Sequence, residues 1–297
     1  MVREERPVKE TVQYKIFKVI NVLILLLVIY VTLFPFLNVV AQSFSGQAEI
    51  NAGKVNLIPK GFNLTTYQTI LHDKTFWTSY RNTIVYTVLG TVIAMVMTTT
   101  FAYVLSKKRL MGRKFFTSMA IFTMFFNGGL IPNYILIKNL GWTNTIWAIV
   151  IPGAISIFNM LIMKSFFEAM PEELEEAASI DGSSTYGTFL KIILPLSKPI
   201  LATMVLFYAV GNWNSWFGAF LYLDQSDKFP VTLYLRNLLA GATSGQSAGA
   251  TSADDLQQIG ANIKAVTMVL TVLPILMVYP FVQKYFVSGI MLGSVKQ

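Results

Sequence analysis

The sequence predicts an all-α protein that crosses a membrane six times. Of its 297 residues, 54% are hydrophobic and only 13% are charged, whereas a soluble domain carries roughly 25% charged residues. The charges are also unevenly spaced, leaving six long stretches without Asp, Glu, Lys or Arg. A helix needs about 20 apolar residues to cross the hydrocarbon core of a bilayer. These stretches therefore predict a polytopic membrane protein.

The six expected spans follow from the uncharged stretches. We expect membrane-spanning helices at residues 17–40, 79–105, 115–137, 145–167, 199–221 and 265–287. The first shows no cleavage-site pattern and is expected to be a retained helix. After it, an amphipathic run with Tyr67, Ile70 and Leu71 on one face either lies along the membrane surface or is an ordinary ordered loop. A further uncharged stretch, 237–253, is rich in Gly, Ser, Ala and Thr and is expected to be a loop.

Helix-breaking residues stand inside the third and fourth expected spans. Gly128, Gly129 and Pro132 interrupt the third, and Pro152 and Gly153 interrupt the fourth. Backbone groups freed by such residues must be satisfied by neighbouring helices or by water. Two interpretations remain open: tight helix packing through small residues, or kinked helices beside a polar path.

The basic residues predict the orientation of the chain. Fifteen of the 23 Lys and Arg residues lie on the side that holds both termini, with the clearest excess in the short loop KKRLMGRK at 107–114. Lys and Arg accumulate in cytoplasmic loops, so both termini are expected in the cytoplasm. Topology then accounts for the net charge of +8, and no nucleic-acid partner is expected.

Several kinds of chemistry are excluded by composition. The chain has no cysteine and one histidine, His72, which excludes disulfides and thiolate or His-cluster metal sites. No expected span contains an Asp or a Ser/His pair for intramembrane proteolysis. The sequence also lacks the G-x-x-x-x-G-K-[ST] phosphate loop. We therefore expect no catalytic residue, no metal site and no cofactor on this chain.

The cytoplasmic segment between the fourth and fifth spans has an unusual charge. It holds six of the fifteen acidic residues, namely Glu168, Glu172, Glu173, Glu175, Glu176 and Asp181. The glutamates suit the positive end of a helix dipole, and Gly182 can take the left-handed conformation that ends a helix. Ser183 or Ser184 can cap a second short helix, expected to run to Ile193 before Pro195 interrupts it. The pattern predicts two short helices that meet at an elbow.

Residues of this elbow resemble a known signature. Glu176-Ala177-Ala178, then Gly182 after three residues and Ile192-Ile193-Leu194-Pro195 after nine more, are similar to the EAA motif of binding-protein-dependent ABC importer permeases. Further similarity to the maltose-type carbohydrate permeases extends over nearly the whole chain, in the segments 152–167, 213–216, 229–233 and 285–291. The chain most resembles the second, maltose-G-like subunit, in the subgroup for oligosaccharides and complex polysaccharides.

The resemblance implies a type I ABC importer permease fold with three parts. Residues 1–78 would form the cytoplasmic tail, first span and external segment, residues 79–287 the permease core with its coupling segment 168–198, and residues 288–297 a cytoplasmic tail. The implied partners are a homologous permease in a heterodimer, two cytoplasmic ATPase subunits that bind ATP and Mg, and an extracytoplasmic solute-binding protein. The implied location is the bacterial cell membrane.

The resemblance also implies residue roles. Contact with the ATPase would come from the elbow, where Glu173 and Glu176 are expected to face basic residues. The full set of implied coupling residues is Glu173, Glu176, Ala177, Ala178, Asp181, Gly182, Leu194 and Pro195.

A sugar path needs hydroxyl partners and aromatic faces. The candidates are Asn127, Tyr134, Asn159, Tyr208, Asn212, Trp213, Asn214 and Trp216. Asn159 and Asn212 are expected to line a polar cavity, because an amide in lipid is costly. Trp213 and Trp216 have a second interpretation, as interfacial belt or packing residues. The alternative function is a secondary, ion-coupled transporter, which usually shows a charged residue within its spans and inverted repeats.

Overall fold

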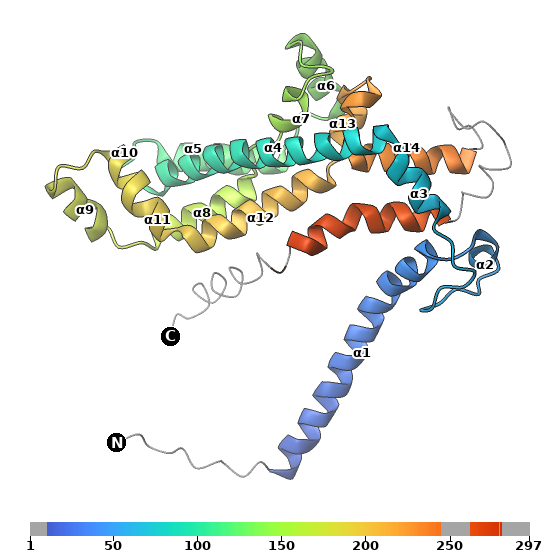
Figure 1. Cartoon of the computed structure of the whole chain (residues 1–297). Coiled ribbons are helices and arrows are strands. Elements are labelled where there is room, and N and C mark those ends of the chain that lie inside the picture. The colour runs from blue at the N-terminus through green and yellow to red at the C-terminus, as the bar shows by residue number, and fades with distance from the viewer. Residues whose placement is uncertain (1–10, 245–261, 279, 281–297) are drawn as a thin grey trace. The chain divides into compact units, whose positions relative to one another are not determined.

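A computed structural model describes residues 11–244, 262–278 and 280. Every regular element in these ranges is a helix, as the sequence predicts. The chain forms two compact units, residues 1–69 with 241–270 and residues 70–240 with 271–297. Figure 1 shows the order of the helices along the chain, and each unit is described in turn.

The first unit is built on the long helix α1, Val12–Ser43. Thr11 caps its start by accepting a hydrogen bond from the Tyr14 N–H, and α1 is long and apolar enough to cross a membrane. The carbonyls at and just beyond its end meet the buried side chain of Asn262, whose amide nitrogen lies 2.7 to 3.2 Å from the carbonyl oxygens of Gln42, Ser43 and Ser45. Carbonyls at a helix C-terminus lack partners within the helix, so Asn262 completes the end of α1.

Two short helices follow α1. Helix α2 spans Gln47–Asn51, and α3 spans Thr65–His72. Helix α3 is the amphipathic run expected from the sequence, and the Tyr67 hydroxyl on it lies 2.9 Å from the Ser43 hydroxyl at the end of α1. The amphipathic run is therefore a helix; its contact with a membrane surface stays a prediction.

The second unit is built from three helices that run side by side (Figure 1). They are α4, Lys74–Ser106, α8, Ile157–Glu168, and α12, Lys198–Asn214. Asp73 caps the start of α4. At the crossing of α4 and α12, Gly90 lies so close to Asn212 that a Cβ at position 90 would stand 3.0 Å from the side-chain nitrogen. A small residue is therefore what allows the two helices to approach.

Buried apolar side chains hold α4, α8 and the elbow together at one end of this unit. Helix α5, Arg113–Phe125, joins them through Ala120. The core consists of Ala102, Tyr103, Leu105, Ala120, Met160, Met163, Phe167, Phe189, Ile193 and Met204. This packing fixes these ends of the helices against the elbow.

The third and fourth expected spans are interrupted at the helix breakers that the sequence shows, whereas the break in the fifth span corrects the expectation of one continuous helix there. Helix α5 meets α6, Leu130–Asn139, at a bend of 111°, where Gly129 has a φ of +90°. Helix α7, Trp147–Val150, ends before Pro152 and Gly153, and α8 begins only at Ile157.

The fifth span is interrupted between α12 and α13, Phe217–Tyr222. The Ser215 carbonyl that this break frees accepts a hydrogen bond from the Thr232 hydroxyl at 3.2 Å. Neighbouring side chains thus satisfy backbone groups released within the membrane segment, as lipid requires.

Two further elements differ from the sequence prediction. After the 3-10 turn Ser226–Lys228, α14 spans Val231–Ser244 and so enters the stretch 237–253 that was expected to be a loop. Leu238, Leu239 and Ala240 are good helix formers, and they extend the helix beyond the apolar run that starts at Val231. The last helix, Asn262–Val278, begins before the expected span 265–287, whose end lies outside the described residues.

Candidate functional site

The first arm of the elbow is α9, Glu173–Ile180. It ends as the sequence predicts, with Gly182 at a φ of +76° and the Ser183 N–H donating to the Ala178 carbonyl at 2.9 Å. This is the left-handed glycine arrangement that commonly closes a helix. Ala178 is buried at 3% exposure, so the apolar face of α9 is turned inward at this residue.

The second arm begins at Ser184, which settles the choice between the two serines. Its hydroxyl accepts the Gly187 N–H at 3.1 Å, and the arm continues through α10, Thr185–Thr188, a π-helical turn, Phe189–Ile193, and α11, Leu194–Leu196.

The expectation that Pro195 interrupts this arm is wrong. Pro195 stands inside a continuous helical arm that runs on to Leu196, so the arm tolerates the one helical hydrogen bond that the proline cannot donate. The chain turns instead at Ser197, with an angle of 82° between this arm and α12.

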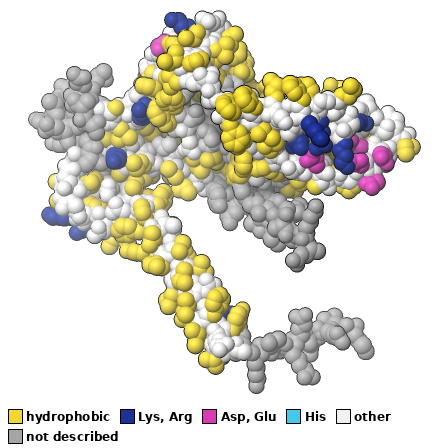
Figure 2. Space-filling model, turned by 180° about the vertical axis from the view of Figure 1, so that it is seen from behind, with side chains coloured by type: hydrophobic (Ala, Val, Ile, Leu, Met, Phe, Trp, Pro, Cys, Tyr) yellow, Lys and Arg dark blue, Asp and Glu magenta, His cyan; other side chains and the backbone are white. Residues whose placement is uncertain are grey.

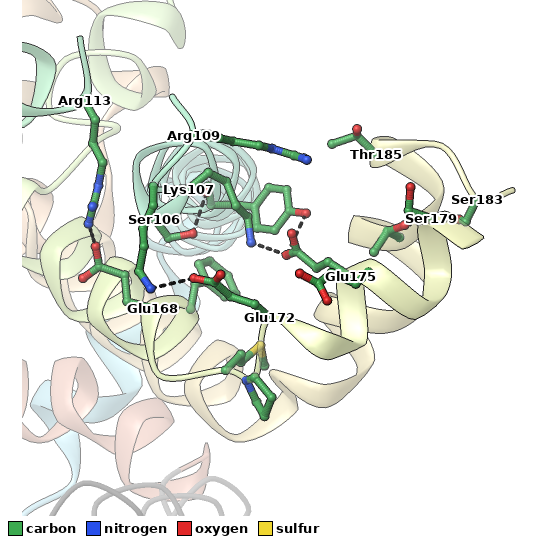
Figure 3. Close-up of a pocket in the computed structure, with 17 residues that line it drawn as sticks. Ser106, Lys107, Arg109, Arg113, Glu168, Glu172, Glu175, Ser179, Ser183 and Thr185 are labelled. Atoms are coloured by element: carbon green, nitrogen blue, oxygen red, sulfur yellow. Dashed lines mark hydrogen bonds and ion pairs between the residues drawn. The ribbon is translucent and has the colours of Figure 1, made fainter. Parts of the chain in front are cut away.

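Opposite charges meet between the elbow and the basic loop 107–114 (Figure 3). Glu175 pairs with Lys107, and Glu172 lies 2.7 Å from Lys108. The hydrogen bond and the charge of Lys108 hold the pKa of Glu172 below its usual value. Two glutamates of this segment therefore neutralise two lysines of the basic loop in the same chain.

A third acid of the segment, Glu168, belongs to the end of α8. It pairs with Arg113 at the start of α5 and lies 2.8 Å from the Lys164 ammonium group one turn away. These contacts join α5 to α8.

The basic loop and the elbow enclose a cleft of about 540 Å³. Its walls carry four cations from the loop and four glutamates from the segment 168–176. Figure 2 shows Lys and Arg side chains beside Asp and Glu side chains at one end of this unit, while hydrophobic side chains cover much of the visible helix surface. The charged end is thus distinct from the surface suited to lipid.

The predicted coupling residues take different positions. Glu173, Glu176 and Asp181 are exposed, and neither Glu173 nor Glu176 forms an ion pair with a residue that the structure describes. Among the others, Ala177, Gly182 and Pro195 are exposed, and Leu194 is half-buried against the core. The two glutamates thus remain available to a partner.

Two large apolar residues of the elbow that the sequence does not single out are exposed. Ile180 is 87% exposed and Tyr186 is 81% exposed, one on each arm. Single exposed apolar side chains are common on protein surfaces, but these two flank the same glycine turn. The sequence signal that could have identified them was their position on either side of the turn residue Gly182.

Three of the predicted path residues lie among packed helices. The Tyr208 hydroxyl lies 2.6 Å from the Thr98 hydroxyl and accepts the Ser156 N–H at 3.1 Å. The Asn212 amide donates to the Thr91 hydroxyl at 3.2 Å, and Asn159 is buried at 8% exposure. These side chains join α4, α8 and α12.

The path residues near the helix breaks lie in several places. The Asn127 oxygen accepts the Gly129 N–H at the α5–α6 bend, and the Tyr134 ring stacks on Tyr222 with centroids 6.0 Å apart. Trp213 is buried and donates its indole N–H to the Thr271 carbonyl at 3.1 Å, which favours its packing role. The exposed Asn214 donates its side-chain amide to the Val210 carbonyl of its own helix.

Trp216 has a basic neighbour that the sequence did not indicate. The guanidinium of Arg236, on α14, stands 3.7 Å from the centre of the Trp216 ring and 5.1 Å from that of Phe220. Arg236 is exposed and pairs with no acid within the described ranges. A planar cation on an aromatic ring leaves its N–H groups free for an anion.

Comparison with known proteins finds relatives that are similar over almost the whole chain. The chain is 43% identical over 285 residues to protein LplC of Bacillus subtilis (strain 168), covering 95% of each chain. It is 39% identical to the polygalacturonan/rhamnogalacturonan transport system permease protein YtcP of the same organism, covering 92% of this chain and 95% of the relative.

A solved structure is also similar along its whole length. It is a chain of a bacterial ABC transporter involved in the import of the acidic polysaccharide alginate, with 34% identity and a TM-score of 0.84. The match covers 95% of this chain and 100% of that one. The architecture is therefore that of an ABC importer permease.

The family comparison covers the interrupted spans, the elbow and the last helix. Residues 75–291 match the family model described as the binding-protein-dependent transport system inner membrane component. That description fits a chain with apolar spanning helices, and it gives no support to the ion-coupled alternative. The chain belongs to the family of inner membrane components of binding-protein-dependent transport systems.

Proposed function

We propose that this chain forms half of the translocation path of an ATP-driven importer of polysaccharide fragments and couples to a separate ATPase through its elbow. The observation that carries the proposal is the elbow itself, which presents Glu173, Glu176, Ile180 and Tyr186 at the surface. The chain lacks a phosphate loop of its own, so nucleotide chemistry belongs to another subunit.

The proposed assembly pairs this chain with a homologous permease. Two ATPase subunits bind ATP and Mg on the cytoplasmic side, and a solute-binding protein delivers sugar from outside. Both termini lie in the cytoplasm, as the excess of basic residues on that side indicates. Acidic and apolar groups on the elbow suit a cleft on the ATPase with basic residues at its rim.

We propose acidic oligosaccharides as the substrate class. Two relatives are named for acidic polysaccharides, polygalacturonan/rhamnogalacturonan and alginate. In this chain Arg236 supports the proposal, because its guanidinium lies over Trp216 without an acidic partner in the described ranges. A sugar ring can stack on the aromatic surface while its carboxylate takes the guanidinium N–H groups. The other path residues would supply hydroxyl and amide contacts.

The complete importer provides the test. The chain is purified with its partner permease, ATPase and binding protein, and ATP hydrolysis is measured with the binding protein loaded with galacturonate oligomers or neutral glucan oligomers. We expect stimulation by the acidic sugar. Replacing Arg236→Gln should weaken that stimulation about tenfold, because a hydrogen bond to a charged group is lost.

A matched control is Lys138→Gln, which removes an exposed cation from the end of α6. This variant should retain the stimulation. Equal activity with neutral and acidic sugars in wild type and Arg236→Gln would contradict the substrate class. ATP-independent uptake driven by an ion gradient would contradict the importer itself.

A further inference from the structure

Glu175 differs from the other glutamates of the elbow because it is turned toward α4. Its carboxylate pairs with the Lys107 ammonium group and accepts the Tyr103 hydroxyl at 3.2 Å. The side chains of Lys107 and Glu175 are only 20% and 21% exposed. Partial burial strengthens the attraction between opposite charges, because less water screens it.

Tyr103 connects the same ion pair to the second arm of the elbow. Its ring centre lies 4.5 Å from that of Phe189 and 5.8 Å from that of Phe167. The Lys107 nitrogen stands 4.2 Å from the centre of the Tyr103 ring, within the range of a cation–π contact. The last turn of α4 and the residue that follows it therefore contact both arms of the elbow.

We infer that Tyr103, Lys107 and Glu175 form a latch that makes the elbow and α4 move as one body. A displacement of the elbow by the ATPase then reaches α4 directly, and through α4 the helices α8 and α12 packed along it. The inference rests on the proposed coupling to an ATPase, and it assigns Glu175 a role in transmission rather than in docking. These three are positioning residues.

The neighbouring ion pair does not share this role. The side chains of Lys108 and Glu172 are 77% and 67% exposed, and water-screened pairs contribute little. The pairs of Glu168 hold α5 to α8 and do not reach α9. Lys108→Gln and Glu172→Gln are therefore matched controls, from the same loop and the same segment as Lys107 and Glu175.

The first test measures sugar transported per ATP hydrolysed in proteoliposomes that contain the complete importer. Glu175→Gln and Lys107→Gln should each lower this ratio at least about fivefold, the scale of a typical coupling between sites. The two control variants should remain within about twofold of wild type. The charge exchange Lys107→Glu with Glu175→Lys should raise the ratio above that of either single exchange.

The second test uses the absence of cysteine from the chain. Lys107→Cys and Glu175→Cys are introduced together and joined by a short, reducible bifunctional thiol reagent. If the elbow and α4 move together, the joined protein transports better than the same variant after reduction. If joining stops transport and reduction restores it, the two elements must separate during the cycle, and the latch is refuted.

Co-purification of the ATPase distinguishes transmission from docking. Glu175→Gln should retain the ATPase at wild-type stoichiometry while losing coupled transport. Loss of the ATPase from this variant would overturn the inference, because Glu175 would then serve the interface. A wild-type importer without sugar-stimulated ATP hydrolysis would instead refute the proposed function, so the two failures are separate.

Discussion

Individual side chains at the elbow occupy two kinds of position. Glu175 pairs with Lys107, whereas Glu173 and Glu176 are exposed and form no ion pair with a residue that the structure describes. The sequence shows that acids gather here, but the pairing of Glu175 with Lys107 joins residues 68 positions apart. Local spacing cannot reveal such a contact, although the opposite charges of the loop 107–114 and the elbow are visible in the sequence. The structure is therefore needed to distinguish the residues of this charged cluster from one another.

Gly182 provides a prediction at the same scale. Its φ of +76° costs a β-branched residue strain of about 1–2 kcal/mol, although no atom lies within 4 Å of an added Cβ. Gly182→Val should uncouple ATP hydrolysis from transport while expression stays normal. Gly182→Asn, which tolerates this conformation, should uncouple less. Coupled transport by Gly182→Val at the wild-type ratio would contradict the role of the elbow turn.

The sequence predicts whole helices best where a long uncharged stretch is sufficient evidence for a helix. Helices α1 and α4 are long apolar helices at the expected places. The interruptions near Pro152 and Gly129 follow from helix breakers visible in the sequence, but the angle between α5 and α6 depends on packing. Helix α14 was missed because the small residues of 237–244 resemble those of a loop. Short helical and loop sequences of this composition are distinguished only by what they pack against.

The crossing of α4 and α12 gives a prediction for these elements. Gly90→Val places a branched side chain against Asn212, where even a Cβ stands at 3.0 Å. Gly211→Val introduces the same residue on α12, where no atom lies within 4 Å of an added Cβ. Overpacking typically costs about 1–3 kcal/mol, so Gly90→Val should unfold at a lower temperature in detergent than Gly211→Val. Equal unfolding temperatures would show that the crossing is not tightly packed.

The end of α1 gives a second prediction for an element. Asn262→Leu removes the amide that meets three carbonyls at the end of this helix. Buried acceptors without a partner cost about 1–3 kcal/mol, so thermal unfolding in detergent should begin at a lower temperature. Thr32→Ala is the control, since the exposed Thr32 hydroxyl bonds only to carbonyls of its own helix. A similar unfolding temperature for both variants would refute the role of Asn262.

At the scale of the whole molecule, the scarcity of charge predicts the membrane location, and the distribution of charge predicts the elbow. The family comparison confirms the membrane protein and the importer class. The eight path residues could be selected from the sequence as polar or aromatic groups, but their arrangement could not. Tyr208, Asn212 and Trp213 serve contacts between helices, and Arg236 on α14 lies over the ring of Trp216. The arrangement of these side chains depends on packing between helices, which the sequence alone does not show.

Orientation is a prediction for the whole chain. Because the chain has no cysteine, single cysteines can be introduced at Ser183 on the elbow and Lys138 at the end of α6. A membrane-impermeant thiol reagent applied to intact cells should label the cysteine at 138 and leave that at 183 unlabelled until the membrane is opened. The reverse pattern would contradict a cytoplasmic elbow.

The central claim is that this chain works in an importer driven by ATP through a separate ATPase. The most direct measurement is uptake of a galacturonate oligomer into proteoliposomes that hold the complete importer, with ATP supplied on the ATPase side and binding protein on the other. The account predicts uptake that requires both ATP and binding protein and continues when ion gradients are abolished. Uptake by this chain alone, driven by an ion gradient without ATP, would contradict it.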